Sequence, residues 1–438
     1  IHMERMSFAL NSLIYLIQFS YEHNENIINK LLKPRLCEPK NYLVLSHDSI
    51  NQLNIVPDRN CIDKKGTKSL WDILDKTCTV IGRRFLKDNL LNPLLDTNKL
   101  QLRYNLVEEL MNEDYISIRK ELKNIIDIER LHRKMAMKMM NPYSFVSLDL
   151  SYTYVNIIIK KIRELDNKKL LDILPSHKTL ASFDEFISEY NDKLIMDKLT
   201  GVNLSNIREN IFKEGLYPNI DSIQKKLDFY NLYLEKLCCY LSDLIDPNKK
   251  MIDMKFNDRD GHYFNLTKSR MKTLKQKLQQ TESKITLDIN GKLVDVNLDK
   301  IEWKGTSSTS KIFTDTMRNY SQVICGLETK MMKLCLEEFS ILLSDYYNKY
   351  SETLIEITSF IGFVDFLCNI TFVSKSNGYC KPEIDIRDHS YIDAKNLRHP
   401  IIEVIHDKVK YIPNDIKLGI EQQNGVLLYG VNAVGKSS

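Results

Sequence analysis

A glycine-rich segment near the end of the sequence carries the clearest chemical pattern. The spacing G-x-x-x-x-G-K-S, known as Walker A, is formed by Gly430, Gly435, Lys436 and Ser437. Glycines let such a loop wrap so that its backbone N–H groups point at phosphate oxygens. Lys436 would neutralise charge on the β- and γ-phosphates, and the hydroxyl of Ser437 would ligate Mg²⁺. The segment therefore predicts a site for ATP and Mg²⁺.

The apolar run before this loop should position it. Residues 425–429 have the sequence G-V-L-L-Y, which predicts a buried strand, and a strand leading into the loop is half of the context that supports the motif. A helix beginning at the loop would add its positive end to the site. The sequence ends at Ser438, before any acidic Mg²⁺ partner or catalytic carboxylate. We therefore expect no catalytic residue within this chain and no ATP hydrolysis by these 438 residues alone.

A second pattern is a run of basic residues without an acidic one. The run contains Lys268, Arg270, Lys272, Lys275 and Lys277. Such a run attracts the phosphate backbone of nucleic acid without reading its sequence. The alternative interpretation is a solvated helix face, which is what most charge runs are. Lys304 and Lys311 are weaker candidates for the same role.

Composition and charge limit the remaining classes. The net charge of only +4 means that any nucleic-acid site is a local patch. The sequence has nine cysteines, an odd number, and no C-x-x-C motif. Neither a disulfide framework nor a zinc knuckle is therefore indicated. No apolar run approaches membrane-spanning length, and the N-terminus lacks a secretory pattern. We expect an intracellular protein without a membrane partner, in a compartment that the sequence does not specify.

Helical patterns dominate the chain. With only 14 glycines and 11 prolines in 438 residues, several domains made mostly of long helices are expected. Apolar residues have helical spacing over residues 10–21, 70–140, 155–174 and 223–244, whereas residues 42–55 are predicted to be strand or loop. The longest pattern, Leu327 to Ile361, lacks Gly and Pro and would form a helix roughly 50 Å long. Two shorter helices broken near Tyr347 are the alternative.

Short strands are expected in two regions. A turn signal over residues 258–261 separates two short apolar strands, and Asn290-Gly291 is the predicted turn of a second hairpin over residues 285–296. Both hairpins lie within helical sequence and predict a small β insert. Past Gly378, residues 384–386, 401–405 and 426–429 are predicted to be short strands, at the beginning of a β-rich or α/β domain.

The nucleotide loop resembles that of the MutS family. The segment from Gly430 to Ser438, which includes Asn432, is similar to the family's G-P-N-x-x-G-K-S-[ST], with Val431 in the place of the usual Pro. The form G-V-N-x-x-G-K-S-S after L-L-Y looks more like a divergent branch of the family from large DNA viruses. Upstream, residues 397–403 resemble the family's R-H-P-[VI]-[VI]-E strand and residues 411–415 its [FY]-[VI]-x-N-[DP] segment.

The resemblance extends over most of the chain. Residues 69–86 look like the family's S-L-x-x-x-L-D-x-T-x-T-x-x-G-x-R-x-L, and residues 125–131 match its D-[LIV]-E-R-L element. Residues 92–94 and 103–110 are also family-like. Residues 261–269 resemble the clamp strand G-Y-[YF]-[IF]-x-[VIL]-[ST]-[KR]-[SG], from which His262 departs.

The resemblance implies a mainly α architecture with a small β-rich insert and the start of an α/β, ABC-type P-loop ATPase domain. The implied domains are a helical core with its N-terminal helix (1–150), the first half of the lever helices (151–250), a β-containing clamp (251–312), the returning half of the levers (313–378) and the N-terminal part of the ATPase domain, ending at Walker A (379–438).

The implied function is that of a DNA mismatch repair ATPase. Its clamp would grip double-stranded DNA under the control of ATP binding and hydrolysis in the complete protein, as a homodimer. The nucleotide site would comprise Gly430, Asn432, Gly435, Lys436, Ser437 and Ser438, with Tyr411 stacking on adenine. A MutS-like clamp for recombination junctions, a helical scaffold with a vestigial P-loop and an SMC-like coiled-coil ATPase are the alternatives.

Phe183 and Glu185 are not interpreted as a mismatch-reading pair. Mismatch-reading members of the family use a Phe-x-Glu pair in an N-terminal domain that we do not recognise in this sequence. Phe183 and Glu185 show that spacing but lie among predicted lever helices. Phe183 is therefore interpreted as an ordinary apolar-face residue.

Overall fold

The computed structural model of the chain forms two compact units. It describes residues 7–23, 25–28, 31, 42–57, 69–257, 259–281, 283–298, 301–305, 309–405, 411–420 and 423–430. Unit 1 comprises Ile1–Met139, Ser147–Asp184 and Lys349–Ser438, and unit 2 comprises Met140–Val146 and Glu185–Asn348. Along the sequence, unit 2 is thus enclosed by segments of unit 1.

The part of the chain up to residue 171 is built from helices, several of which begin at a side-chain cap. These helices are α1 (Ser7–His23), α2 (Glu25–Ile28), α3 (His47–Gln52), α4 (Leu70–Leu74), α5 (Val80–Leu91), α6 (Thr97–Asn112), α7 (Tyr115–Leu122), α8 (Ile128–Ala136), α9 (Tyr143–Glu164) and α10 (Lys168–Leu171). Ser69 caps α4 through a capping box with Asp72, and Asp127 caps α8. The helices expected over residues 70–140 are confirmed, while residues 42–55 contain a loop and α3 rather than a strand.

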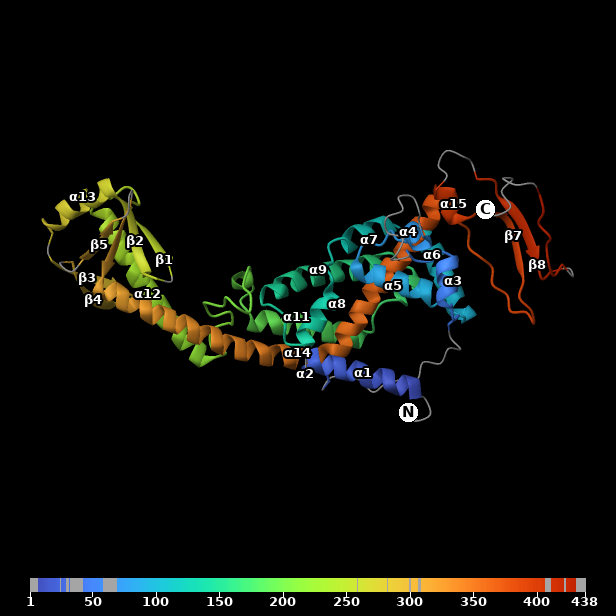
Figure 1. Ribbon diagram of the computed structural model, residues 1–438, viewed down its shortest axis with the longest axis horizontal. Coiled ribbons are helices and arrows are strands. Elements are labelled where there is room, and N and C mark those ends of the chain that lie inside the picture. The colour runs from blue at the N-terminus through green and yellow to red at the C-terminus, as the bar shows by residue number, and fades with distance from the viewer. Residues whose placement is uncertain are drawn as a thin grey trace. The chain divides into compact units, whose positions relative to one another are not determined.

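Unit 2 contains the β insert, which we define as β1 to β6 with α13. It follows α11 (His177–Lys193), the short 3₁₀ helix η4 (Met196–Leu199) and α12 (Pro218–Asp243). An antiparallel sheet has the order β1 (Asp253–Asn257), β2 (Gly261–Thr267), β6 (Thr309–Thr314) and β5 (Ile301–Gly305). A separate hairpin pairs β3 (Lys284–Ile289) with β4 (Lys292–Asn297), and α13 (Lys268–Leu278) lies between β2 and β3 in the chain (Figure 1).

Both predicted hairpins are confirmed. Gly261 begins β2 with a φ of +70°, and Asn290 and Gly291 have φ values of +50° and +80°. Positive φ at both central residues is the geometry of a type I′ turn, which Asn-Gly favours. The pairing of β5 with β6 was not predicted, but the expectation of a mainly helical protein with a small β insert is correct.

Helix α14 (Asp315–Asn377) is continuous over 63 residues, so it is roughly 95 Å long (Figure 1, orange). It extends the predicted helix at both ends, and the alternative of two helices broken near Tyr347 is wrong. Thr314 starts it by accepting a hydrogen bond from the backbone N–H of Met317 at 3.1 Å. Contrary to the expectation that no apolar run approaches membrane-spanning length, one 18-residue stretch of α14 is apolar enough by composition. However, 67% of that stretch is buried within the protein, as in a core helix.

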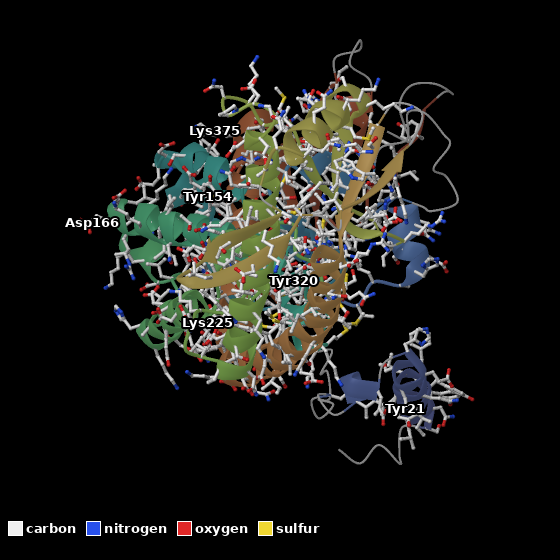
Figure 2. All side chains as sticks on the ribbon, turned by 90° about the vertical axis from the view of Figure 1, so that its left-hand side faces the viewer. Tyr21, Tyr154, Asp166, Lys225, Tyr320 and Lys375 are labelled. Carbon is white, nitrogen blue, oxygen red and sulfur yellow. The ribbon has the colours of Figure 1, made fainter. Side chains whose placement is uncertain are left out.

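Aromatic rings fill the core of unit 2. Phe186 and Tyr346 are fully buried and lie edge to face, with ring centroids 5.4 Å apart. Tyr320 of α14, labelled in Figure 2, lies 4.7 Å from the rings of both Tyr230 and Tyr233 of α12. These contacts fasten α12 to the first part of α14, the two helices that flank the β insert in the chain.

Phe183 belongs to the core of unit 1. Its side chain is fully buried, and its ring lies edge-on to that of Tyr152 with 4.9 Å between centroids. The interpretation of Phe183 as an ordinary apolar residue is therefore confirmed.

The last described part of the chain differs from its prediction. β7 (Ile392–Leu397) and β8 (Asn414–Leu418) form an antiparallel hairpin, but residues 384–386 and 425–429 form no strand. A strand needs a hydrogen-bonded neighbour, and residues 425–429 are exposed without one among the described residues. Residues 401–405 form helix α15 (Pro400–Ile405) rather than a strand, because proline is well suited to the first turn of a helix. The α/β beginning of an ATPase domain stays a prediction.

Candidate nucleic-acid interface

Helix α13 carries all five predicted DNA-binding residues on the surface of the β insert. Thr267 accepts a bond from the backbone N–H of Arg270 and so caps the helix. The inward face is anchored by Leu274, which is fully buried. Leu274 is the buried residue of α13, and the side chains of Lys268, Lys272, Lys275 and Lys277 are all exposed.

Arg270 differs from these four lysines. Its side chain is half-buried, and its Nη1 donates to the backbone carbonyl of Met251 at 3.0 Å. The N–H of Met251 in turn donates to the hydroxyl of Ser242 at 2.7 Å. Arg270 therefore holds the loop between α12 and β1 against α13, and this loop carries Lys249 and Lys250, both exposed.

We define the basic surface as six exposed lysines from α13 and this loop. They are Lys249, Lys250, Lys268, Lys272, Lys275 and Lys277. None of them forms an ion pair with an acidic residue that the structure describes. The predicted run missed Lys249 and Lys250, and the only signal for them in the sequence was their adjacency, which is weak by itself.

An aromatic ring lies beside the basic surface. The Nζ of Lys275 lies 4.8 Å from the centroid of Trp303 on β5. Lys304, the next residue along that strand, has its Nζ 3.6 Å from the carboxylate of Glu302. The surface therefore ends at β5, where acidic and basic side chains pair.

Lys311, the second weaker candidate, is engaged within the sheet. Its Nζ lies 2.5 Å from Asp260 Oδ2 and 4.3 Å from the ring centroid of Tyr263. The hydrogen bond from Lys311 lowers the pKa of Asp260 below its usual value. The charge of Lys311 is thus largely compensated by Asp260.

Gly261 and His262 explain one segment of the resemblance. A Cβ at Gly261 would lie 2.5 Å from Ser321 Oγ on α14, so only glycine fits this close approach. The backbone N–H of His262 donates to the same Oγ at 2.8 Å, and its ring Nδ1 lies 2.9 Å from it. His262, which departs from the family pattern, has its pKa lowered by burial. These contacts fasten β2 to α14.

Little of the predicted nucleotide site can be placed. Asn432, Gly435, Lys436, Ser437 and Ser438 lie outside the described residues, and with them the predicted Mg²⁺ ligand. Gly430 is described and exposed, and Tyr411 is half-buried shortly before β8. Among the described residues, no group of three or more His, Cys, Asp or Glu side chains could hold a metal ion.

Comparison with known proteins settles the family. A family model described as MutS domain III matches residues 48–371. This chain belongs to the MutS family. It is 34% identical over 433 residues to a DNA mismatch repair protein mutS homologue of Acanthamoeba polyphaga mimivirus, a match that covers 95% of the chain and 38% of the relative. The chain is also 26% identical over 432 residues to the DNA mismatch repair protein MutS of Clostridium botulinum (strain 657 / Type Ba4), covering 98% of the chain and 42% of the relative.

The viral relative agrees with the resemblance to a MutS branch from large DNA viruses. The chain spans about two-fifths of the length of both relatives.

Two segments that carried the MutS resemblance meet in unit 1. Arg84, from residues 69–86, donates from Nη1 and Nη2 to the carboxylate of Asp127, from residues 125–131, at 2.9 and 2.6 Å. Nη2 of Arg84 also lies 2.6 Å from Glu129. These motif residues of the MutS chain therefore have a structural role, because they join α5 to α8.

Proposed function

We propose that this chain is the DNA-gripping part of a MutS-type mismatch repair ATPase, and that the β insert is its clamp. The basic surface would contact the phosphate backbone of duplex DNA. In the complete protein, a homodimer, ATP and Mg²⁺ bound at the Gly430–Ser437 loop would control the clamp. ATP hydrolysis would need acidic residues beyond those of this chain.

The basic surface is the observation that carries this proposal. Six exposed lysines without acidic partners among the described residues concentrate positive charge on α13 and the α12–β1 loop, although the whole chain has a net charge of only +4. Lysines that meet phosphates release condensed counterions, which favours binding and makes it depend on salt. Trp303 beside Lys275 adds a flat ring at the edge of the surface. No base-reading group is required for such binding.

The test is a salt titration of duplex binding. Changing Lys268, Lys272 and Lys277 to Ala leaves the Arg270–Met251 contact and the Lys275–Trp303 contact intact. The triple variant should bind more weakly, and the slope of log affinity against log salt should fall by roughly two to three units. The matched control changes three exposed lysines of α12 and α14, Lys226, Lys330 and Lys333, and should keep the wild-type slope.

The choice of DNA separates the remaining possibilities. Phosphate contacts predict equal losses on matched and mismatched duplex, because they position a protein without identifying bases. Wild-type preference for a four-way junction over a mispair would favour a recombination clamp. An unchanged salt slope in a triple variant that melts like wild type would show that the lysines are only a solvated face.

A further inference from the structure

Arg398 lies at the C-terminal end of α14. Its Nη2 donates to the carbonyls of Asn377 at 2.8 Å and of Gly378 at 3.0 Å. Its Nη1 donates to Glu403 Oε1 of α15 at 2.8 Å. A single half-buried guanidinium therefore joins the last residue of α14, the residue after it and α15.

The C-terminal end of α14 offers backbone carbonyls that a guanidinium can bind. Gly378 has a φ of +63°, and the N–H of Tyr379 donates back to the carbonyl of Ser374 at 2.9 Å, so the helix stops here. The last carbonyls of a helix lack partners within it and carry the negative end of the helix dipole. A guanidinium offers several N–H donors in one plane, which a lysine cannot reproduce.

The order of the elements along the chain places the Arg398 contact between the β7–β8 hairpin and α14. Arg398 follows β7 directly and Pro400, two residues later, begins α15, while β8 pairs with β7 and leads toward residues 425–430. At its other end, α14 begins directly after β6 of the β insert. One continuous helix thus has the proposed clamp at its N-terminus and Arg398 at its C-terminus.

We propose that Arg398 is the positioning residue that couples the nucleotide state to α14. The inference rests on the proposed function, in which ATP controls DNA binding. A shift of α15 or of the β7–β8 hairpin would change how Arg398 is shared between Glu403 and the end of α14. Such a contact biases α14 only if it differs between the nucleotide states, and the coupling must be reciprocal.

The experiment uses the full-length protein and compares Arg398→Ala and Arg398→Lys with wild type. The matched control is Arg387→Ala, since Arg387 pairs with Asp385 and stacks on Tyr391 without bonding to α14. Duplex affinity is measured without nucleotide and with a non-hydrolysable ATP analogue, and analogue affinity is measured with and without duplex. A melting curve accompanies each variant.

The coupling factor is the ratio of duplex affinity with the analogue to duplex affinity without nucleotide, and it should be the same in wild type and in Arg387→Ala. In both Arg398 variants we expect the coupling factor to lie within about twofold of 1, which means almost no coupling. The duplex affinity without nucleotide and the analogue affinity without duplex should each stay within about threefold of wild type. Arg398→Lys keeps the charge at the helix end, so it tests coupling even if Arg398→Ala unfolds.

Two outcomes overturn the inference. One is a wild-type factor in a folded Arg398 variant. The other is an equal loss of both affinities with the factor preserved, which is the mark of a structural role. Failure of the proposed function looks different, because wild type itself would then bind no duplex or show no response to the analogue.

Discussion

Gly82 of α5 lies directly against the carboxylate of Asp365 on α14, so that a Cβ at Gly82 would be 2.1 Å from Oδ2. Asp365 is fully buried, and it accepts bonds from the N–H of Cys78 at 2.9 Å and from the N–H and hydroxyl of Thr79, both at 2.7 Å. Burial raises the pKa of Asp365, against the effect of these donors. The start of α5 therefore binds a side chain that α14 supplies.

Replacing Gly82 with Ala should destabilise the protein despite the better helix propensity of Ala. The methyl group would push the carboxylate away from its donors, and the net cost should be about 2–4 kcal/mol after a gain of about 1 kcal/mol from propensity. Urea unfolding checks this value. Gly326→Ala on α14, where a Cβ meets no atom within 4 Å, is the control and should be neutral or stabilising. Equal behaviour of the two variants would contradict the argument.

The Gly82–Asp365 contact also shows what could be predicted from the sequence. Periodic apolar residues predicted the helices around Gly82 and a long helix from Leu327 to Ile361, because such patterns are local. Asp365 lies beyond the predicted end of that helix, in the part that the structure adds. The contact itself joins residues far apart in the chain, and no local pattern specifies a partner at that separation. For the same reason the two hairpins were predicted from their turns, whereas β5 and β6, which lack a comparable tight-turn signal, were not.

The candidate interface was predicted only in part. The basic run on α13 could be found because its charges are consecutive, but the role of Arg270 depends on the fold of the α12–β1 loop. Lys249 and Lys250 belong to the basic surface because they lie in this loop, which Arg270 holds against α13. Residues 401–405 were wrongly predicted to be a strand because five apolar-rich residues fit either structure, and Pro400 decides for a helix.

The pair of Arg84 and Asp127 predicts a pH dependence. The hydrogen bond from Arg84 is the main cause that lowers the pKa of Asp127. A carboxyl whose pKa is lower in the folded state stabilises the fold above its unfolded pKa of about 4, and this contribution is lost as the pH falls through the folded pKa. Asp127→Asn, which keeps a helix-capping side chain, should cost about 1 kcal/mol at pH 7.

Urea unfolding of wild type and Asp127→Asn between pH 7 and pH 3.5 measures this effect. The difference in unfolding free energy should stay constant down to about pH 5 and shrink below about pH 4. Asp96→Asn, at the cap of α6, removes no arginine partner and serves as the control. A difference that grows on acidification would refute the assignment.

Tyr411 gives a prediction about nucleotide binding in the full-length protein. If its ring stacks on adenine, Tyr411→Ala should weaken ATP binding several-fold, because a stacked aromatic contact contributes about 1 kcal/mol. Tyr411→Phe should bind ATP nearly as wild type does, since stacking needs the ring and not the hydroxyl. Isothermal titration with a non-hydrolysable analogue distinguishes the two. Equal losses in both variants would indicate a hydrogen-bonding or structural role instead.

Arg270 should act on DNA mainly through the loop that it holds. Its Nη1 bonds to the carbonyl of Met251, so Arg270→Ala frees the segment that carries Lys249 and Lys250. If those lysines contact phosphates only when the loop is held, the single Arg270 variant should flatten the salt slope by more than the roughly one unit of a lost cation. The Lys249→Ala/Lys250→Ala variant should flatten it by roughly two units.

Combining Arg270→Ala with Lys249→Ala and Lys250→Ala distinguishes an Arg270 that positions the loop from an Arg270 that contacts DNA directly. Residues that share one structural role are not additive, so the triple variant should lose little more than the larger of the two separate losses. Fluorescence anisotropy across a salt series measures each slope, and melting curves confirm that the fold is kept. Lys272→Ala in place of Arg270→Ala is the matched control and should add its own single unit in either background, because Lys272 holds no loop. Full additivity of the Arg270 substitution would mean that its guanidinium meets DNA directly and that the bond to Met251 is incidental.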